Sequence, residues 1–420
     1  VQTIGGGGGF GAEVIGDANL GMTSSGRGIA NAGSITFVGD GDLVVTAQND
    51  SPALVLQSIG GGGGWIGNVG GNATLGANQI GATNAGSIDG RVRYPAIQTN
   101  GENSIGILAQ AIAGGGGFTG RSSGNALTLG GTIASNSTSN AGDVLLKNHA
   151  RVTTFGLSTA AIIAQSIGGG GGASATSASG TIGLGAISTA GSSGSLPTIQ
   201  SGNVTVTNTQ NLSTNAIGSV GLLAQSIAGG GGYVAQPGNQ TQHQVVYGSN
   251  GAINAAAGDV NADITGSEII TTSDYSPTLV AQSIGGGGGF ALVTGSGTGS
   301  TQVGSRNLSG AATAGDVNVT LNSFLRTQGE FSTALTAQSI GGGGGYTGQA
   351  LGNARFGALN VSGDLSSGNV DATLTGNVIT TGNNSSALVV QTIGGGGGFG
   401  AEVIGDANLG MTSSGQGIAN

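Results

Sequence analysis

The sequence contains no cysteine in its 420 residues. This excludes disulfide bonds, cysteine-ligated zinc or iron–sulfur centres, and cysteine nucleophiles. Stability must then come from a large core or from a long ladder of hydrogen bonds. Histidine is almost as scarce, because only His149 and His243 are present, in different parts of the chain and without a repeating partner. We therefore expect no catalytic centre built on histidine.

Charge is also scarce, with 9 basic and 18 acidic residues and a net charge of −9. The basic residues are scattered, so no patch for nucleic acid is present, nor one for an anionic membrane surface. No apolar run is long enough to cross a bilayer, so we expect no membrane insertion by this segment. Disordered chains usually combine low hydrophobicity with high net charge. Short runs of Val, Ile, Leu and Thr here predict an ordered chain instead.

Glycine, in contrast, is abundant, with 93 residues. The strict Gly-X-Y period of collagen is absent. Glycine is concentrated in a motif that occurs eight times: Gln-Ser-Ile or a close variant, then a glycine run, then in seven copies an aromatic residue. Ala173 takes the aromatic position in the remaining copy. The glutamines of the motif are Gln2, Gln57, Gln110, Gln165, Gln225, Gln282, Gln338 and Gln391. The aromatic residues are Phe10, Trp65, Phe118, Tyr233, Phe290, Tyr346 and Phe399.

The motif divides residues 1–420 into one continuous repeat array. Successive glutamines are 53 to 60 residues apart, which defines seven modules of about 55 residues. Residues 1–31 return at 390–420 with a single difference, Arg27 against Gln416, after 389 residues. Because repeats normally drift apart, this near-identical copy indicates a second-order period. We expect the sequence to be a fragment of a longer array, which also fits a start at Val1 without a signal peptide.

A second marker, a small residue followed by Gly and a polar residue, splits each module into two arms. The distance from the marker glycine to the next glutamine is always 23 or 24 residues, whereas the other arm varies from 29 to 37. The constant arm shows the period-two alternation of half-buried strands, as in Val317, Val319 and Leu321. The strand Leu279–Ile284 is apolar or small on both faces and should be the most buried. No stripe of helical period is present.

Short strands at a fixed spacing, without hairpin turns, predict an all-β fold of the parallel β-solenoid class. We expect two coils of about 28 residues in each module; the alternative is one wide coil per module. Equivalent residues would then stack in register at about 4.8 Å. The stacked glutamines could form a side-chain amide ladder along the axis, and an inward-facing amide must be fully hydrogen-bonded.

The glycine runs allow three interpretations: a flat β-stack, an extended polyproline-II-like segment, or a flexible loop. Their regular setting between isoleucine and an aromatic residue favours order. They lack the Gly-Lys-Ser/Thr of a phosphate loop and the aspartates of a calcium β-roll. We therefore predict no cofactor and no metal site. Asp40 and Asp42 could hold a cation, but a solvated turn is the simpler interpretation.

Carboxylates recur beside the marker glycine at Asp143, Asp259 and Asp316, and could resemble the acids of a polysaccharide-cleaving β-helix. Serine or asparagine replaces them in the other modules, a pattern that suits a turn position. The aromatic residues after the glycine runs could stack on sugars, although we favour their use as filling beside glycine. Neither pattern indicates an enzyme.

The run Leu222 to Gly232, together with Asn203 to Asn208, resembles the glycine-rich passenger repeats of large bacterial autotransporter-type surface proteins. The resemblance covers all seven modules. It implies a Gram-negative, extracellular location and a β-helical stalk, adhesin or biofilm-matrix filament that associates with itself, with surface glycans as a further candidate partner. The sequence lacks that family's signal peptide and C-terminal membrane barrel, so the secretion route stays open.

We therefore expect a non-enzymatic structural fibre or adhesin. The alternatives are a β-helix that binds or cleaves polysaccharide and, third, an ice-binding solenoid, suggested by Thr205-Val206-Thr207.

Overall fold

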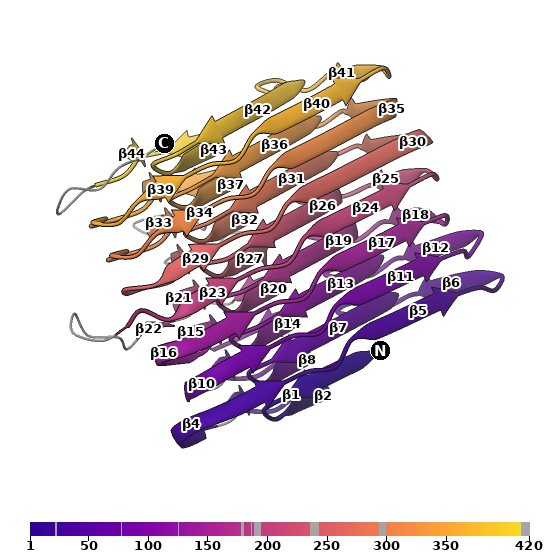
Figure 1. Cartoon of the computed structure of the whole chain (residues 1–420). Helices are drawn as coiled ribbons and strands as arrows, with labels where there is room; N and C mark the ends of the chain where they lie inside the picture. The colour runs from indigo at the N-terminus through magenta and orange to yellow at the C-terminus, as the bar shows by residue number, and fades with distance from the viewer. Residues whose placement is uncertain are drawn as a thin grey trace.

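The computed structural model describes residues 1–21, 23–76, 78–124, 126–177, 180–185, 187–188, 195–235, 243–293 and 300–412. Within these ranges every helix or strand assigned is a β-strand. Each strand pairs in parallel with its equivalents earlier and later in the chain. The strands therefore stack in successive levels, from the indigo first strands to the yellow last ones (Figure 1). The fold is therefore all-β and of the parallel β-solenoid type.

The chain visits five sheets, named A to E here, in a fixed order. Sheet A holds the strands of the Gln-Ser-Ile motif: β1 (Gln2–Gly5), β7 (Leu54–Gly60), β13 (Ile107–Ile112), β19 (Ala160–Ile167), β26 (Val220–Ile227), β31 (Leu279–Ile284), β36 (Leu335–Ile340) and β42 (Leu388–Ile393). Sheet B begins within the glycine runs: β2 (Gly8–Val14), β8 (Gly63–Val69), β14 (Gly116–Ser122), β20 (Gly171–Ser177), β27 (Gly231–Val234), β32 (Gly288–Val293), β37 (Gly344–Leu351) and β43 (Gly397–Ile404).

Sheets C and D follow in the variable arm. Sheet C consists of β3 (Ala18–Leu20), β9 (Ala73–Leu75), β15 (Ala126–Leu129), β21 (Gly180–Leu184), β28 (His243–Tyr247), β33 (Ser300–Val303), β38 (Asn353–Phe356) and β44 (Ala407–Leu409). Sheet D consists of β4 (Thr23–Asn31), β10 (Asn78–Asn84), β16 (Thr132–Asn140), β22 (Ile187–Ser188), β23 (Thr198–Gln200), β29 (Asn254–Ala256), β34 (Ala312–Thr313) and β39 (Leu365–Ser366).

Sheet E comes from the constant arm, where two strand positions lie end to end and fuse in some coils. Its strands are β5 (Ile35–Gly39), β6 (Leu43–Thr46), β11 (Ile88–Val92), β12 (Ala96–Thr99), β17 (Val144–Asn148), β18 (Arg151–Thr154), β24 (Val204–Asn208), β25 (Leu212–Thr214), β30 (Val260–Thr271), β35 (Val317–Thr327), β40 (Val370–Leu374) and β41 (Val378–Thr380).

The expectation of two coils per module is wrong. Paired residues are a whole module apart: the Gln57–Gln110 pair is separated by 53 residues and the Gln165–Gln225 pair by 60. One passage through all five sheets therefore makes one wide coil. The physical reason is that the variable arm contributes the strands of three sheets, B, C and D, instead of closing a short coil of its own.

Sheet A lies between two apolar layers. On one face Leu222 and Ala224 belong to the same cluster as Val204 and Val206 of sheet E. On the other face Leu223 belongs to a cluster with the aromatic residues of sheet B. All six residues of β31 are buried, in agreement with its apolar or small residues on both faces. Sheets B and C enclose a further cluster, and sheet D packs around a smaller one.

Candidate functional site: axial ladders and end faces

The eight glutamines of sheet A form one continuous row. The Nε2 of each glutamine donates a hydrogen bond to the Oε1 of the next one along the axis, at 2.5 to 2.7 Å. The six inner glutamines have no exposed surface. Every inner amide therefore has both a donor and an acceptor partner, which offsets the cost of burying a polar group.

The glycine runs form the corner between sheets A and B. Gly63 and Gly64 have φ values of +129° and +141°, a region that essentially only glycine occupies. A Cβ atom at Gly64 would overlap the carbonyl oxygen of Gly9 in the neighbouring coil. Backbone bonds join the runs from coil to coil, for example from Gly115 N to the Gly60 oxygen at 2.9 Å. Glycine is needed here because successive backbones touch.

The aromatic residues that follow the glycines stack along the axis inside the molecule. The ring centroids of Phe10 and Trp65 are 4.4 Å apart, and those of Phe290 and Tyr346 are 4.7 Å apart. Further stacked pairs join Trp65 to Phe118, Tyr233 to Phe290, and Tyr346 to Phe399. The five inner rings are at most 4% exposed, whereas Phe10 in the first coil is 69% exposed. The inner rings are therefore inaccessible to a sugar and fill the space beside the glycine runs.

In five of the six inner coils a serine beside the glutamine links the coil to the next one, and sequence reasoning missed this role. Ser226 Oγ donates to the carbonyl of Gly202 at 2.8 Å and accepts a hydrogen bond from the N–H of Gly258 at 2.9 Å. Both glycines are the turn markers that precede sheet E. Ser58, Ser166, Ser283 and Ser339 make the same two bonds with the marker glycines of their own coils. We call this pair of bonds the serine staple.

The marker carboxylates do not converge on a site. Asp143, Asp259 and Asp316 each accept a hydrogen bond from the backbone N–H of the following coil, at 2.7 to 2.8 Å. Asn203 lies in the same row between Asp143 and Asp259, and its Oδ1 accepts the same kind of bond. The row thus satisfies backbone groups at a turn, as Asp and Asn commonly do.

A second turn row precedes sheet A, where one residue of each coil has positive φ. Tyr275 and Phe331 occupy this position with φ values of +52° and +54°, which is unusual for bulky side chains. Their rings stack with centroids 5.3 Å apart. Tyr275 donates its phenolic hydrogen to Glu402, and Gln349 Nε2 donates to the same carboxylate oxygen, both at 2.5 Å. Burial, and then the bond to Glu402, raise the pKa of Tyr275.

The remaining candidates for chemistry are isolated. His149 is exposed, and its Nδ1 shares a 2.8 Å hydrogen bond with the Oγ1 of Thr209. The side chain of His243 lies outside the described part of the chain. Asp40 and Asp42 are both exposed. Across the described ranges, no three His, Cys, Asp or Glu residues gather as metal ligands, and no helix is suited to crossing a membrane.

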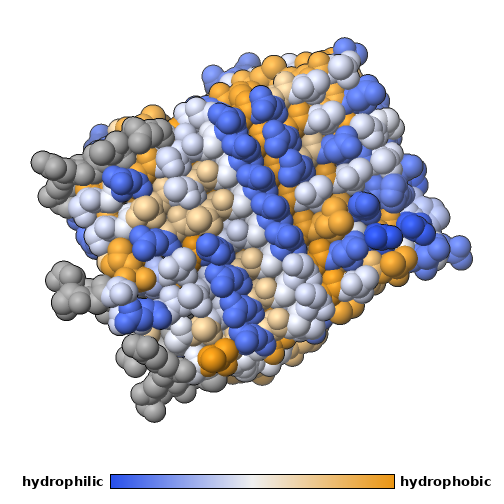
Figure 2. All heavy atoms as spheres, in the orientation of Figure 1, coloured by the Kyte–Doolittle hydropathy of each residue, from blue (hydrophilic) through white to orange (hydrophobic). Residues whose placement is uncertain are grey.

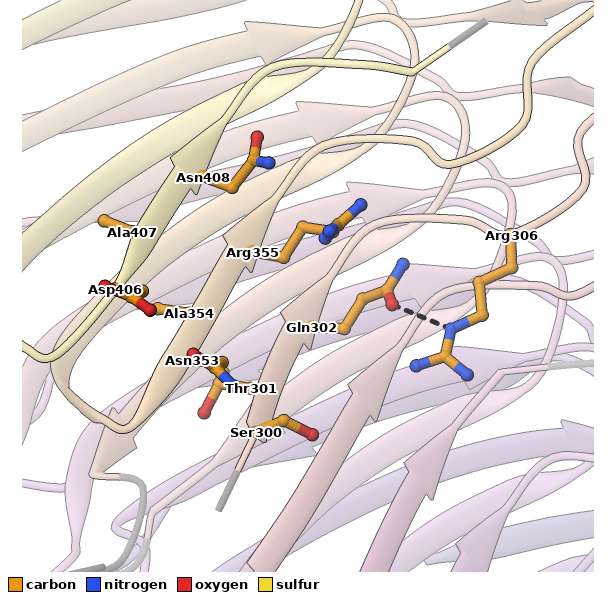
Figure 3. A pocket seen from close by; sticks show the side chains of 10 residues that line it. All are labelled: Ser300, Thr301, Gln302, Arg306, Asn353, Ala354, Arg355, Asp406, Ala407 and Asn408. Atoms are coloured by element: carbon orange, nitrogen blue, oxygen red, sulfur yellow. Dashed lines mark hydrogen bonds between the residues drawn. The ribbon is translucent and has the colours of Figure 1, made fainter. Parts of the chain in front are cut away.

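Two open cavities are lined by residues that the structure describes. The first, of about 560 Å³, lies over sheet C and contains Gln302, Arg306 and Arg355. Arg306 Nε donates to Gln302 Oε1 at 2.7 Å, and Arg355 extends from the neighbouring strand (Figure 3). The second, of about 580 Å³, lies beside the exposed Phe10 and Glu13 in the first coil. Neither cavity was indicated by a sequence motif.

Exposed apolar side chains gather at the two ends of the stack. Of the fifteen large apolar residues that are exposed within the described ranges, twelve belong to the first or last coil. Polar stripes run along the axis over the visible lateral face, between paler and apolar bands (Figure 2). The twelve end residues are Val1, Phe10, Ile15, Ile29, Val38, Leu43 and Val45 in the first coil, and Ile379, Leu388, Val390, Ile404 and Leu409 in the last.

The chain matches no protein-family description, no curated protein and no solved structure.

Proposed function

We propose that this chain is a non-enzymatic structural segment of an extracellular fibre, a seven-coil β-solenoid that associates with itself end to end. The observation that supports this most is the set of ladders that continue from coil to coil, such as the glutamine row through all eight strands of sheet A. The first and last coils present open strands of all five sheets, and together they carry twelve of the fifteen exposed large apolar side chains of the described residues. Open, apolar strand edges favour pairing with further strands.

The internal architecture suits a load-bearing stack. The glutamine row, the glycine runs and the aromatic rows continue from coil to coil with the same contacts. With each coil contacting mainly its neighbours, stability adds up along the axis as in other solenoids. At about 4.8 Å per coil, seven coils give an axial period of roughly 34 Å.

A bacterial surface is the proposed location, with adhesion or matrix building as the purpose. Support comes from the resemblance of Leu222 to Gly232 to autotransporter-type passenger repeats. The absence of cysteine is compatible with it, because the coil-to-coil ladders stabilise the fold without disulfides. The lateral faces, with their polar rows, would then contact solvent, neighbouring fibres or target surfaces.

Electron cryomicroscopy and sedimentation over a range of protein concentrations test the proposal. We expect filaments with a reflection near 4.8 Å along the axis. Val44→Lys places an inward-pointing charge on the first coil and should abolish assembly, because stacking would bury an unpaired charge. Val45→Lys is the matched control, since its outward side chain stays in solvent. Trp65 fluorescence verifies folding of the adjacent coil. Compact monomers at all concentrations would contradict the proposal.

Glycan binding is a second candidate function, because the cavity over sheet C offers amide and guanidinium groups from Gln302, Arg306 and Arg355. A glycan array with wild type and Arg355→Ala tests it. We expect any genuine binding there to weaken in the variant, whereas unchanged binding would locate the glycan site elsewhere.

A further inference from the structure

Opposite charges gather at different levels of the outer face of sheet E. Levels are counted along the axis from β5, so β11, β17, β24 and β30 belong to the second to fifth levels (Figure 1). The coil register gathers four of the nine basic residues on the second and third levels: Arg91, Arg93, Lys147 and Arg151. The fourth level, residues 203–215, carries no charge, and β30 on the fifth exposes Asp263 and Glu268. Each of these levels has a neighbouring level on both sides.

The charges of the third and fifth levels stand in two axial rows. Each row has a basic residue on the third level, a neutral one on the fourth and an acidic one on the fifth. The first row is Lys147, Thr207 and Asp263. The second row is Arg151, Asn211 and Glu268. Opposite charges of one row are two coil spacings apart, about 9.6 Å, and none of the four forms an ion pair among the described residues.

We propose that two copies of this chain bind each other through the outer faces of sheet E, with their solenoid axes antiparallel. A two-fold axis along the strands of the fourth level relates the copies. Each residue then faces the same row of the second copy, on the level equally far beyond the fourth. Lys147 faces Asp263 and Arg151 faces Glu268, and symmetry repeats both pairs. Thr207 lies on the two-fold axis and faces its own counterpart.

The charge pattern selects this antiparallel arrangement. If the two axes ran parallel, a two-fold axis between the rows would place Lys147 opposite Arg151. It would also place Asp263 opposite Glu268. Like charges that face each other across an interface suppress association. Only the antiparallel arrangement brings every one of these charges to an opposite one.

The face is large enough for a stable dimer. The 11 residues of β35 extend about 36 Å and five levels extend about 24 Å. Their product, roughly 860 Å², matches the area that each partner contributes to a standard interface. The fourth level presents small, half-buried side chains at the centre, from Thr205, Thr207 and Ser213. Sheets that pack face to face lie about 10 Å apart, a distance that lysine or arginine together with a carboxylate can span.

Like charges face each other only at the turns that flank the strands. Asp143 comes opposite Asp259, but both carboxylates are bound to backbone N–H groups of their own chain, at 2.7 and 2.8 Å. Glu102 comes opposite Glu330, on the turn where the chain leaves sheet E for sheet A. The contact is therefore centred on the strands. In the proposed fibre the pattern would return every seven coils, so two antiparallel fibres would stay in register.

Charge reversal followed by sedimentation tests the contact. All variants carry Val44→Lys, which is expected to block end-to-end assembly and so isolates lateral association. Lys147→Glu/Arg151→Glu makes both sets of charges acidic, and Asp263→Lys/Glu268→Lys makes both basic. Each variant alone should dimerise about a hundredfold more weakly than the unreversed chain. An equimolar mixture of the two should dimerise again, because every facing pair is then opposite in charge.

The variant with all four reversals is the matched control. It keeps the natural net charge and exchanges the acidic and basic levels, so the antiparallel dimer should form as in the unreversed chain. The four side chains point outward, and circular dichroism verifies that each variant folds.

Cross-linking of an introduced cysteine tests the orientation, because the natural chain has none. Thr207→Cys places two thiols opposite each other on the two-fold axis, within reach of a linker that spans about 10 Å. Thr320→Cys is the control in the same row, exposed on the sixth level. Its two thiols would be four coil spacings apart, about 19 Å, and should stay unlinked.

The outcomes separate this contact from the fibre. Loss of dimer in both double reversals, recovery in their mixture and in the fourfold variant, and linking of Thr207→Cys alone support the lateral contact. Dimers that ignore the reversals, a mixture that stays monomeric, or equal linking of Thr320→Cys overturn it. Filaments of the natural chain without lateral dimers in the Val44→Lys background also overturn it and leave the fibre intact. Lateral dimers without filaments overturn the end-to-end fibre alone.

Discussion

Gly117→Ala should destabilise the protein strongly, because residue 117 has no room for a methyl group. Gly117 has a φ of +138°, and a Cβ atom there would overlap the carbonyl oxygen of Gly64 in the adjacent coil. Holding alanine in this region of φ costs about 1–3 kcal/mol. Forcing the coils apart adds about 1–3 kcal/mol, the usual cost of overpacking. The expected loss in free energy of unfolding is therefore about 2–6 kcal/mol.

Gly9→Ala is the matched control. Gly9 occupies the same position of the glycine run in the first coil, where a Cβ would meet nothing within 4 Å. Its effect should stay within about 0.5 kcal/mol, as for ordinary surface substitutions. Gly9 lacks the positive φ of Gly117, so the comparison measures backbone strain and overlap together.

Urea denaturation followed by Trp65 fluorescence measures both variants. Trp65 is the only tryptophan, is 4% exposed, and stacks on Phe118 next to the substituted glycine. Far-ultraviolet circular dichroism reports the strands of the other coils. If Gly117→Ala unfolds at the same urea concentration as Gly9→Ala, the reasoning is refuted. The close contact between successive glycine runs would then not be the reason that these positions require glycine.

Three further results are expected. Ala111→Ser should raise the urea midpoint, with a gain of about 0.5–1.5 kcal/mol, because a hydroxyl there can complete a serine staple in the one inner coil that has alanine at this position. Gln225→Met should lower stability by about 2–6 kcal/mol, since it leaves two buried neighbouring amides each short of a partner; Gln2→Met, at the end of the row, should cost less than half of that. Burial raises the pKa of Tyr346 to about 12; an unfolded tyrosine ionises near pH 10, so stability should be retained below pH 10 and fall between pH 10 and 12. A pH titration of tyrosinate absorbance measures this, and Tyr346→Phe should reduce the loss.

The repeat length and the parallel in-register pairing could be predicted from the sequence, because equivalent glutamines recur at nearly constant spacing. The number of coils per module could not. Strands such as β16 (Thr132–Asn140) are rich in Thr, Ser and Asn and lack a clear alternation. In a parallel stack such strands are held by backbone bonds to the coils above and below, so tertiary context outweighs local propensity.

The axial stacking of glutamine and aromatic residues follows from the same register. No sequence motif predicts the serine staple, although the spacing of the marker glycines is related to it. The distance from each marker glycine to the next glutamine is fixed at 23 or 24 residues. Ser58 bonds to the carbonyl of Gly33, 25 residues earlier, so this arm cannot change length without breaking the bond. The cavity over sheet C had no such signal, because its residues come from three coils.

The glutamine row also has a direction. Every amide in it donates the same way, from Gln2 toward Gln391, so the side-chain dipoles add instead of cancelling. The first coil therefore offers an amide oxygen at its end, and the last coil offers an amide N–H. A filament built from such units is a polar object, with a plus and a minus end that differ chemically. Its growth should accordingly proceed at unequal rates from its two tips, as in other polar biological polymers.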